Sequence, residues 1–204
     1  MALWILVCMI VVPAIGGFYL SRGKAKTLAR LEAKLTADIR NRLTSIAREV
    51  GGSVSEGAVL DTARGKMSLV ASKAPESYVV DLAKFVGKTD LSGAVTVVRR
   101  EDASKVIATR NLRVLEPKDP MMAEHYHVLV SDVEEGQRWA TAKLAEKLRA
   151  LETGVRARCR VQVAGGTATV FVFRNLAKAE ELKAFYDGAV GVIDALDGSS
   201  RPTS

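Results

Sequence analysis

Three arginines and two phenylalanines stand at spacings that could build a binding surface. Arg156, Arg158 and Arg160 alternate in the segment VRARCRVQV, and Phe171 and Phe173 alternate in TATVFVF. In a strand, every second side chain points to the same face of the sheet. Guanidinium groups beside aromatic rings can hold a phosphate, a carboxylate or single-stranded nucleic acid. These five residues form the candidate ligand face; the simpler alternative is a half-exposed surface whose arginine stems cover the rings while carboxylates from elsewhere neutralise the charge.

The two histidines of the chain, His125 and His127, form a second candidate site. A His-x-His pair on one strand face can supply two metal ligands, but a site needs a third donor and supporting hydrogen bonds. Glu124, Asp132 and Cys159 qualify only by residue type, and Glu124 would point to the opposite face if the strand already began there. Histidines that alternate with core residues are more often surface or edge residues of a sheet. We therefore predict no metal site and no cofactor.

The segment VGKTD contains Gly87-Lys88-Thr89, the residues that end a phosphate-binding loop. The full motif requires a further glycine at position 82, so that backbone amides can surround the phosphates, and Leu82 stands there instead. We interpret VGKTD as a turn. No nucleophile elbow, paired-carboxylate spacing, dinucleotide fingerprint or metalloprotease helix is present in the sequence. The sequence therefore offers no reason to expect an enzyme.

A hairpin is predicted to carry the candidate ligand face. If Gly165-Gly166 forms a two-residue turn, the apolar residues of the two strands lie opposite one another. The expected pairs are Val163 with Ala168, Val161 with Val170 and Cys159 with Val172. This register gives one wholly apolar sheet face, so the arginines and phenylalanines must share the other face.

Two helices are predicted on either side of this hairpin. The first follows the strand HYHVLVSD; Asp132 caps it with Glu135 at the capping-box spacing, and Gly154 ends it. Its apolar stripe consists of Ala140, Leu144, Leu148 and Leu151. The last helix begins at Asn175 and stops at Asp197-Gly198, and its stripe consists of Leu182, Tyr186, Ala189, Ile193 and Leu196.

The first half of the domain is predicted to be rich in strands. The segments AVLDT, KMSLVAS, SYVVDLAKF and GAVTVVRR are short, β-branched and separated by turn residues. The segment KVIATRNLRVLEPKDP is ambiguous and closes as a loop. Residues 51–198 are thus expected to form one α+β domain with an antiparallel sheet and helices packed on one face, and residues 199–204 a disordered tail.

Residues 22–50 are predicted to form a basic amphipathic stalk helix that Gly51-Gly52 ends. Its apolar residues recur at steps of three and four: Leu28, Leu31, Leu35, Ile39, Leu43, Ile46 and Val50. We expect this stripe to pack on the chain's own domain. The alternatives are a helix lying on anionic lipid and a coiled coil, although Asp38 and Arg42 occupy positions where a strict heptad needs apolar residues.

The N-terminal segment is predicted to be a membrane anchor. Residues 2–20 carry no charge, and as a helix they would span about 28 Å, close to the hydrocarbon core of a bilayer. A cleaved signal peptide would need a basic start and a small-x-small cleavage site, and Pro13 disfavours a buried soluble helix. Residues 1–21 are therefore expected to form a single transmembrane signal anchor. The residues at its membrane interfaces would be Trp4, Phe18, Tyr19, Arg22, Lys24 and Lys26.

The charge distribution predicts the orientation and excludes one class of partner. Of the net charge of +7, +5 belongs to residues 22–50, so the domain that follows is nearly neutral and we expect no nucleic acid partner. Basic flanks remain on the cytoplasmic side of a membrane, which places the C-terminal domain in the cytoplasm. The two cysteines, Cys8 and Cys159, offer no disulfide framework and are consistent with a reducing compartment.

These features predict a single-pass protein of the bacterial cell membrane whose cytoplasmic, non-catalytic α+β domain is a scaffold or recruits a partner. Its partners would be the lipid bilayer and either an unidentified protein or a second copy of the chain. The first alternative is a membrane-tethered ligand- or metal-binding domain. Two others are an exported envelope domain, if the anchor is cleaved or the topology is inverted, and a small subunit of a larger membrane complex.

Overall fold

The described part of the protein is an α+β structure built on one antiparallel sheet. The computed structural model describes residues 27, 29–73, 78–104 and 112–198. The predicted anchor at residues 1–21, its six interface residues and the tail at residues 199–204 lie outside these ranges. Among the helices within them, none combines the length and the apolar character that crossing a bilayer requires.

Within the described ranges nine strands form the sheet, and the hairpin of the last two of them lies in its middle. The strand order is β1-β2-β3-β4-β9-β8-β5-β7-β6, and all neighbours are antiparallel. The strands are β1 (Ser53–Val54), β2 (Val59–Thr62), β3 (Gly65–Lys73), β4 (Tyr78–Lys88), β5 (Val95–Arg99), β6 (Arg113–Leu115), β7 (Tyr126–Val130), β8 (Cys159–Ala164) and β9 (Thr167–Val172). The β8–β9 hairpin therefore joins the first four strands to the remaining three.

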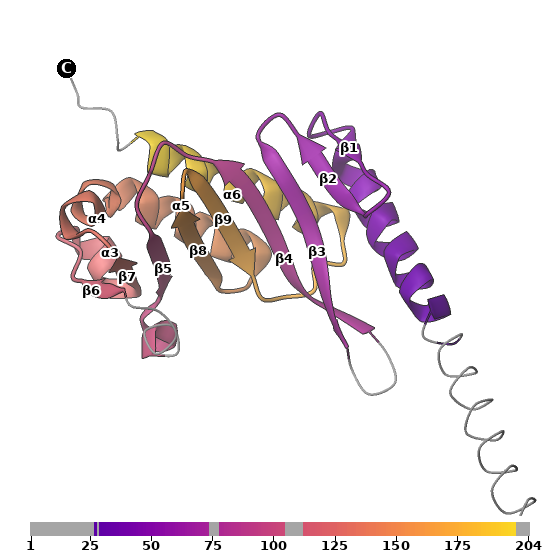
Figure 1. The fold of residues 1–204 in the computed structure, drawn as a ribbon, viewed down its shortest axis with the longest axis horizontal. Coiled ribbons are helices and arrows are strands. Elements are labelled where there is room, and N and C mark those ends of the chain that lie inside the picture. The colour runs from indigo at the N-terminus through magenta and orange to yellow at the C-terminus, as the bar shows by residue number, and fades with distance from the viewer. Residues whose placement is uncertain (1–26, 28, 74–77, 105–111, 199–204) are drawn as a thin grey trace, which may run out of the picture.

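The long helices cover one face of this sheet. The helical elements with described bounds after β5 are η1 (Arg100–Asp102), α3 (Pro120–His125), α4 (Val133–Trp139), α5 (Ala142–Val155) and α6 (Ala179–Gly198). Figure 1 shows α5 and α6 behind the sheet, and its near face carries no long helix. This arrangement confirms the predicted class, an antiparallel sheet with helices packed on one face.

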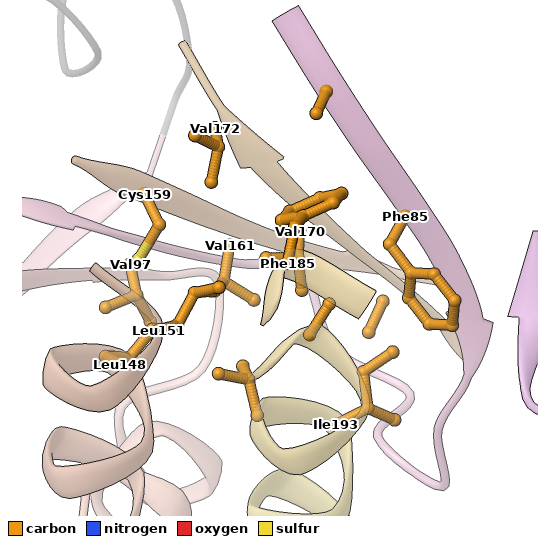
Figure 2. Close-up of a cluster of buried hydrophobic side chains, with 14 of the residues drawn as sticks. Phe85, Val97, Leu148, Leu151, Cys159, Val161, Val170, Val172, Phe185 and Ile193 are labelled. Carbon is orange, nitrogen blue, oxygen red and sulfur yellow. The ribbon is translucent and has the colours of Figure 1, made fainter. Parts of the chain in front are cut away.

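The main core lies between the sheet and the helices α5 and α6. Figure 2 shows Leu148 and Leu151 of α5 and Phe185 of α6 pointing toward Val161 and Val170 of the central hairpin. All five side chains are at most 1% exposed. Burying a side chain of this kind contributes about 1.5–3 kcal/mol, so this layer is the principal source of stability. A small second cluster of Val98, Ala103 and Leu129 lies apart from this core.

The central hairpin has the predicted register. Cys159 pairs with Val172, Val161 with Val170 and Val163 with Ala168. The turn residues Gly165 and Gly166 have φ angles of 54° and 71°. Both angles are positive, as the two-residue turn of a twisted hairpin requires and glycine permits. The buried residues alternate with Arg160 and Gln162, whose side chains are only partly buried.

Several element boundaries differ from the sequence prediction. The helix predicted from Asp132 to Gly154 is two helices, because Ala140 and Thr141 leave the helical conformation between α4 and α5. The break lets Trp139 and Leu144, at the two adjoining helix ends, both lie fully buried in one core. Asp132 does cap α4, since its carboxylate accepts a hydrogen bond of 2.9 Å from the amide of Glu135.

Two further segments fold differently from the prediction. Residues 113–115, within the segment that the sequence left ambiguous, form the edge strand β6 because they pair with β7. The last helix begins at Ala179 rather than Asn175. The carboxylate of Glu181 accepts hydrogen bonds from the amides of Ala177 and Lys178 and so satisfies donors at the start of α6.

The C-terminal half of the stalk helix packs on the domain, as predicted. The described helix runs through residues 29–47, and Leu43 and Ile46 are at most 1% exposed in the main core. Gly51 has a φ of +65°, and the amide of Gly52 donates a 2.8 Å hydrogen bond to the carbonyl of Ala47. This backbone pattern is the one with which a glycine ends a helix. The helix leads away from the domain toward its N-terminus (Figure 1).

Candidate functional site

Arginines gather around one cavity at the end of the central hairpin. The cavity has a volume of about 480 Å³ and lies where β5 ends, β8 begins and β9 ends. Its arginines are Arg99, Arg156, Arg158, Arg160 and Arg174, and Phe173 contributes an aromatic ring. The volume is within the range of small-ligand sites. We call this cavity the arginine pocket.

The arginine pocket brings together four of the five residues predicted as the candidate ligand face. Arg156, Arg158, Arg160 and Phe173 line it, whereas Phe171 does not. Phe171 instead stacks on Phe173, with ring centroids 6.5 Å apart and an interplanar angle of 20°. The predicted face is thus an aromatic pair beside a cluster of arginines.

Arg156 reaches the pocket from a different element than predicted. It is the residue that ends α5, and its backbone is left-handed, with φ 51° and ψ 41°. The strand begins only at Cys159. The amide of Ala157 donates a 3.1 Å hydrogen bond to the carbonyl of Glu152, which completes the helix end. Arg156 therefore occupies a position at which glycine is the usual residue.

Carboxylates from neighbouring elements neutralise some of the arginines. Arg158 forms an ion pair with Glu101 and lies 3.5 Å from the carboxylate of Asp102, both in η1. Arg174 bonds Glu181 of α6 at 2.9 Å. These contacts agree with the simpler alternative for Arg158, because an acidic segment from elsewhere compensates its charge. They also hold the two guanidinium groups in place at the pocket wall.

Arg156 and Arg160 have no carboxylate partner within the described ranges. The guanidinium carbon of Arg160 lies 5.1 Å from the ring centroid of Phe173, in a cation–π arrangement. Its Nε is buried and has no hydrogen-bond partner among those residues. A buried donor without an acceptor costs about 1–3 kcal/mol, which an anionic ligand in the pocket would offset.

A buried carboxylate accepts hydrogen bonds from two residues that line the pocket, Arg99 and Cys159. Glu152 of α5 is 7% exposed and accepts hydrogen bonds from Arg99 Nε at 3.1 Å, the Tyr126 hydroxyl at 2.9 Å and the Cys159 amide at 3.0 Å. A second bond joins Arg99 Nη2 to the other carboxylate oxygen. The carboxylate therefore ties α5 to the ends of β5, β7 and β8 and orients Arg99.

The same environment keeps two neighbouring groups protonated. Burial, reinforced by the negative charge of Glu152, raises the pKa of the Cys159 thiol well above its ordinary value. Burial and Glu152 also raise the pKa of the Tyr126 hydroxyl. Cys159 is thus a small, uncharged core residue at the pocket, and the charged groups there are the guanidinium groups and their carboxylates.

Sequence reasoning missed three residues of this site: Arg99, Glu152 and Arg174. Arg174 directly follows Phe173, so its position after the second strand was an available signal. Arg99 carried no such signal, because strand pairing brings it to the hairpin from a distant part of the chain. Glu152 precedes the hairpin by only a few residues, but its contacts with Arg99 and Tyr126 depend on how α5 packs against the sheet.

The histidines do not form the predicted strand pair. His125 ends the helix α3, and only His127 lies in the strand β7. The helix begins at Pro120, with Asp119 accepting a hydrogen bond from the amide of Met122, and it continues into the residues expected to start the strand. Throughout the described ranges no group of three potential metal ligands comes together.

The segment VGKTD does not form the predicted turn, because its first three residues continue the strand β4. Gly87 and Lys88 are part of β4, and the Thr89 hydroxyl donates a 2.7 Å hydrogen bond to Asp197. A Cβ at Gly87 would lie 2.7 Å from the side chain of Ile193, so this glycine permits close packing of α6.

No family model, no curated protein and no solved structure matches this chain.

Proposed function

We propose that this protein is a membrane-tethered, non-catalytic binding domain that recruits a partner to the inner face of the cell membrane. In this proposal, the arginine pocket holds an anionic group of the partner. The observation that carries it is the pair of guanidinium groups without a carboxylate partner among the described residues, Arg156 and Arg160, at a cavity of ligand size. Charge-assisted hydrogen bonds to an anion would satisfy both groups.

The stalk supports the membrane part of the proposal. Residues 22–50 carry a net charge of +5, and each basic residue near an anionic membrane surface contributes about 1 kcal/mol of attraction. The burial of Leu43 and Ile46 joins the stalk firmly to the domain. An anchor at residues 1–21 would then confine the pocket to a thin layer and raise its effective concentration for membrane partners.

A labelling experiment tests the topology. The full chain would carry one reporter cysteine at position 199, with Cys8 and Cys159 replaced, and whole cells would receive a thiol reagent that does not cross membranes. Protection of the reporter until lysis is the expected result. Labelling in cells with an intact inner membrane would contradict the cytoplasmic assignment and favour the exported envelope domain.

Cross-linking in membranes tests the recruiting site. We expect a partner to cross-link to the wild-type chain, and we expect this cross-linked product to be absent for the Arg160→Gln variant. The matched control is Arg149→Gln, because Arg149 is exposed on α5 away from the pocket. Equal cross-linking of the wild type and Arg160→Gln would refute a role for the pocket in recruitment.

A further inference from the structure

The charge balance around the arginine pocket favours a ligand with one negative charge. Five guanidinium groups line the pocket, and four carboxylates of the described residues pair with them. Those carboxylates are Glu101, Asp102, Glu152 and Glu181. One positive charge remains, which a single carboxylate would neutralise. A phosphate monoester, with a charge of about −1.5 to −2 at neutral pH, would leave the site negative.

The donors that remain suit a planar anion. A guanidinium group presents parallel N–H groups that match the two oxygens of a carboxylate. The Nε of Arg160 is buried without an acceptor among the described residues, whereas Arg158 is already bonded to Glu101. Arg156 and Arg160, the two arginines of the pocket without a carboxylate partner among the described residues, are therefore the donors for an incoming carboxylate.

An apolar surface lies beside these donors. The side chain of Phe173 is 55% exposed, although a phenylalanine ring is usually buried, and it borders the pocket next to Arg160. The second ring, Phe171, supports it from the sheet. A ligand with an apolar group next to its carboxylate would cover the exposed ring while its charge meets the arginines.

The conformation of Arg156 also points to a role for its side chain. A non-glycine residue in the left-handed region carries a steric cost, and a helix end of this type is better served by glycine. Residues held in such conformations cluster at ligand sites, where the side chain offsets the cost by its function. Here the strained residue is one of those that line the arginine pocket.

We propose that the arginine pocket binds an apolar monocarboxylate: a carboxylate group attached next to an aromatic or aliphatic group. This inference rests on the proposed function, because it names the anionic group that the pocket recognises. The chemistry is shared by small carboxylic acids and by the carboxyl terminus of a peptide that ends in an apolar residue.

Calorimetric titration of the full chain in detergent tests the ligand class. The probes are N-acetylphenylalanine, its uncharged amide, inorganic phosphate, and a short peptide ending in phenylalanine with a free or amidated terminus. Both free carboxylates are expected to bind at least about tenfold more tightly than their amides and than phosphate, as the loss of a charged hydrogen bond implies. Tighter binding of the peptide than of N-acetylphenylalanine would assign a chain terminus as the source, and equal binding a small acid.

Three variants connect the binding to the pocket. Arg160→Gln and Arg160→Lys are both expected to weaken N-acetylphenylalanine binding by about tenfold or more, because lysine keeps the charge and loses the parallel donors. Arg156→Gly should weaken binding while the melting temperature stays the same or rises, which separates lost binding from lost folding. Arg149→Gln, outside the pocket, should bind as the wild type does.

The contrary outcomes are distinct for the two proposals. Tighter binding of phosphate, with loss in Arg160→Gln, would overturn the monocarboxylate and leave the pocket as an anion site. Equal binding of the carboxylate and its amide would likewise overturn the monocarboxylate. Binding of no probe, or binding that all three pocket variants retain, would overturn both the ligand class and the proposed function.

Discussion

Replacing Glu152 by glutamine should destabilise the domain severely. Each carboxylate oxygen accepts two hydrogen bonds: one from Arg99 Nε and the Cys159 amide, the other from Arg99 Nη2 and the Tyr126 hydroxyl. A glutamine amide has only one oxygen, so in either orientation its NH₂ group must face an arginine donor. The substitution therefore both removes the buried charge and places donor against donor.

The expected cost is about 3 kcal/mol in the free energy of unfolding. Breaking a buried ion pair costs about 3–5 kcal/mol, because the remaining charge loses its partner. Glu152 is 7% exposed, but the side chain of Arg99 is 27% exposed and can regain some hydration, which favours the lower end of that range. For a domain of this size, about 3 kcal/mol corresponds to a decrease of about 6–12 °C in melting temperature.

Urea unfolding followed by circular dichroism measures this cost. The double variant Glu152→Leu with Arg99→Met removes both charges and should be less destabilised than the sum of the two single changes, by about 1 kcal/mol or more. If Glu152→Gln unfolds within about 0.5 kcal/mol of the wild type, a typical surface substitution, the assigned role of this carboxylate is wrong.

Three further predictions concern packing, the helix end and pH. Gly188→Ala should destabilise by about 1–3 kcal/mol, since its Cβ would lie 2.7 Å from a side-chain carbon of Leu151 and 3.3 Å from its Cα. Gly191 lies in the same helix, and a Cβ there would meet only the side chain of Lys147 at an ordinary 3.6 Å, so Gly191→Ala should stabilise the domain by up to about 1 kcal/mol. Equal melting temperatures of Gly188→Ala and Gly191→Ala would contradict the close approach of α6 to α5 at Gly188. Arg156→Gly should stabilise by about 1 kcal/mol in urea unfolding, because glycine tolerates the left-handed backbone; a loss of stability would show that the side chain supports the fold. The free energy of unfolding should fall above about pH 9, by about 1.4 kcal/mol per pH unit, because the Cys159 thiol ionises in the unfolded chain but stays protonated in the folded domain. Replacing Cys159 by alanine should flatten this fall when the free energy of unfolding is measured against pH.

Local periodicity was sufficient to predict the central hairpin and the helix faces. Gly165-Gly166 and the alternating residues around it determine one register, because a shift by one residue would place arginines in the core. The apolar steps in the stalk likewise predicted that Leu43 and Ile46 are buried, as they are. Four of the residues that line the arginine pocket, Arg156, Arg158, Arg160 and Phe173, were within reach of the same reasoning.

The tertiary structure alone decided which other groups meet at the arginine pocket. The sheet inserts β8 and β9 between β4 and β5, and this long-range pairing brings Arg99 to the hairpin and Glu152 beneath it. It also places Glu101 and Asp102 on Arg158, and so determines which of the described arginines remain without a carboxylate. The periodicity of a sequence reports which face of an element is apolar. The order in which elements pair depends on the free energy of the whole packed core, and no local pattern records it.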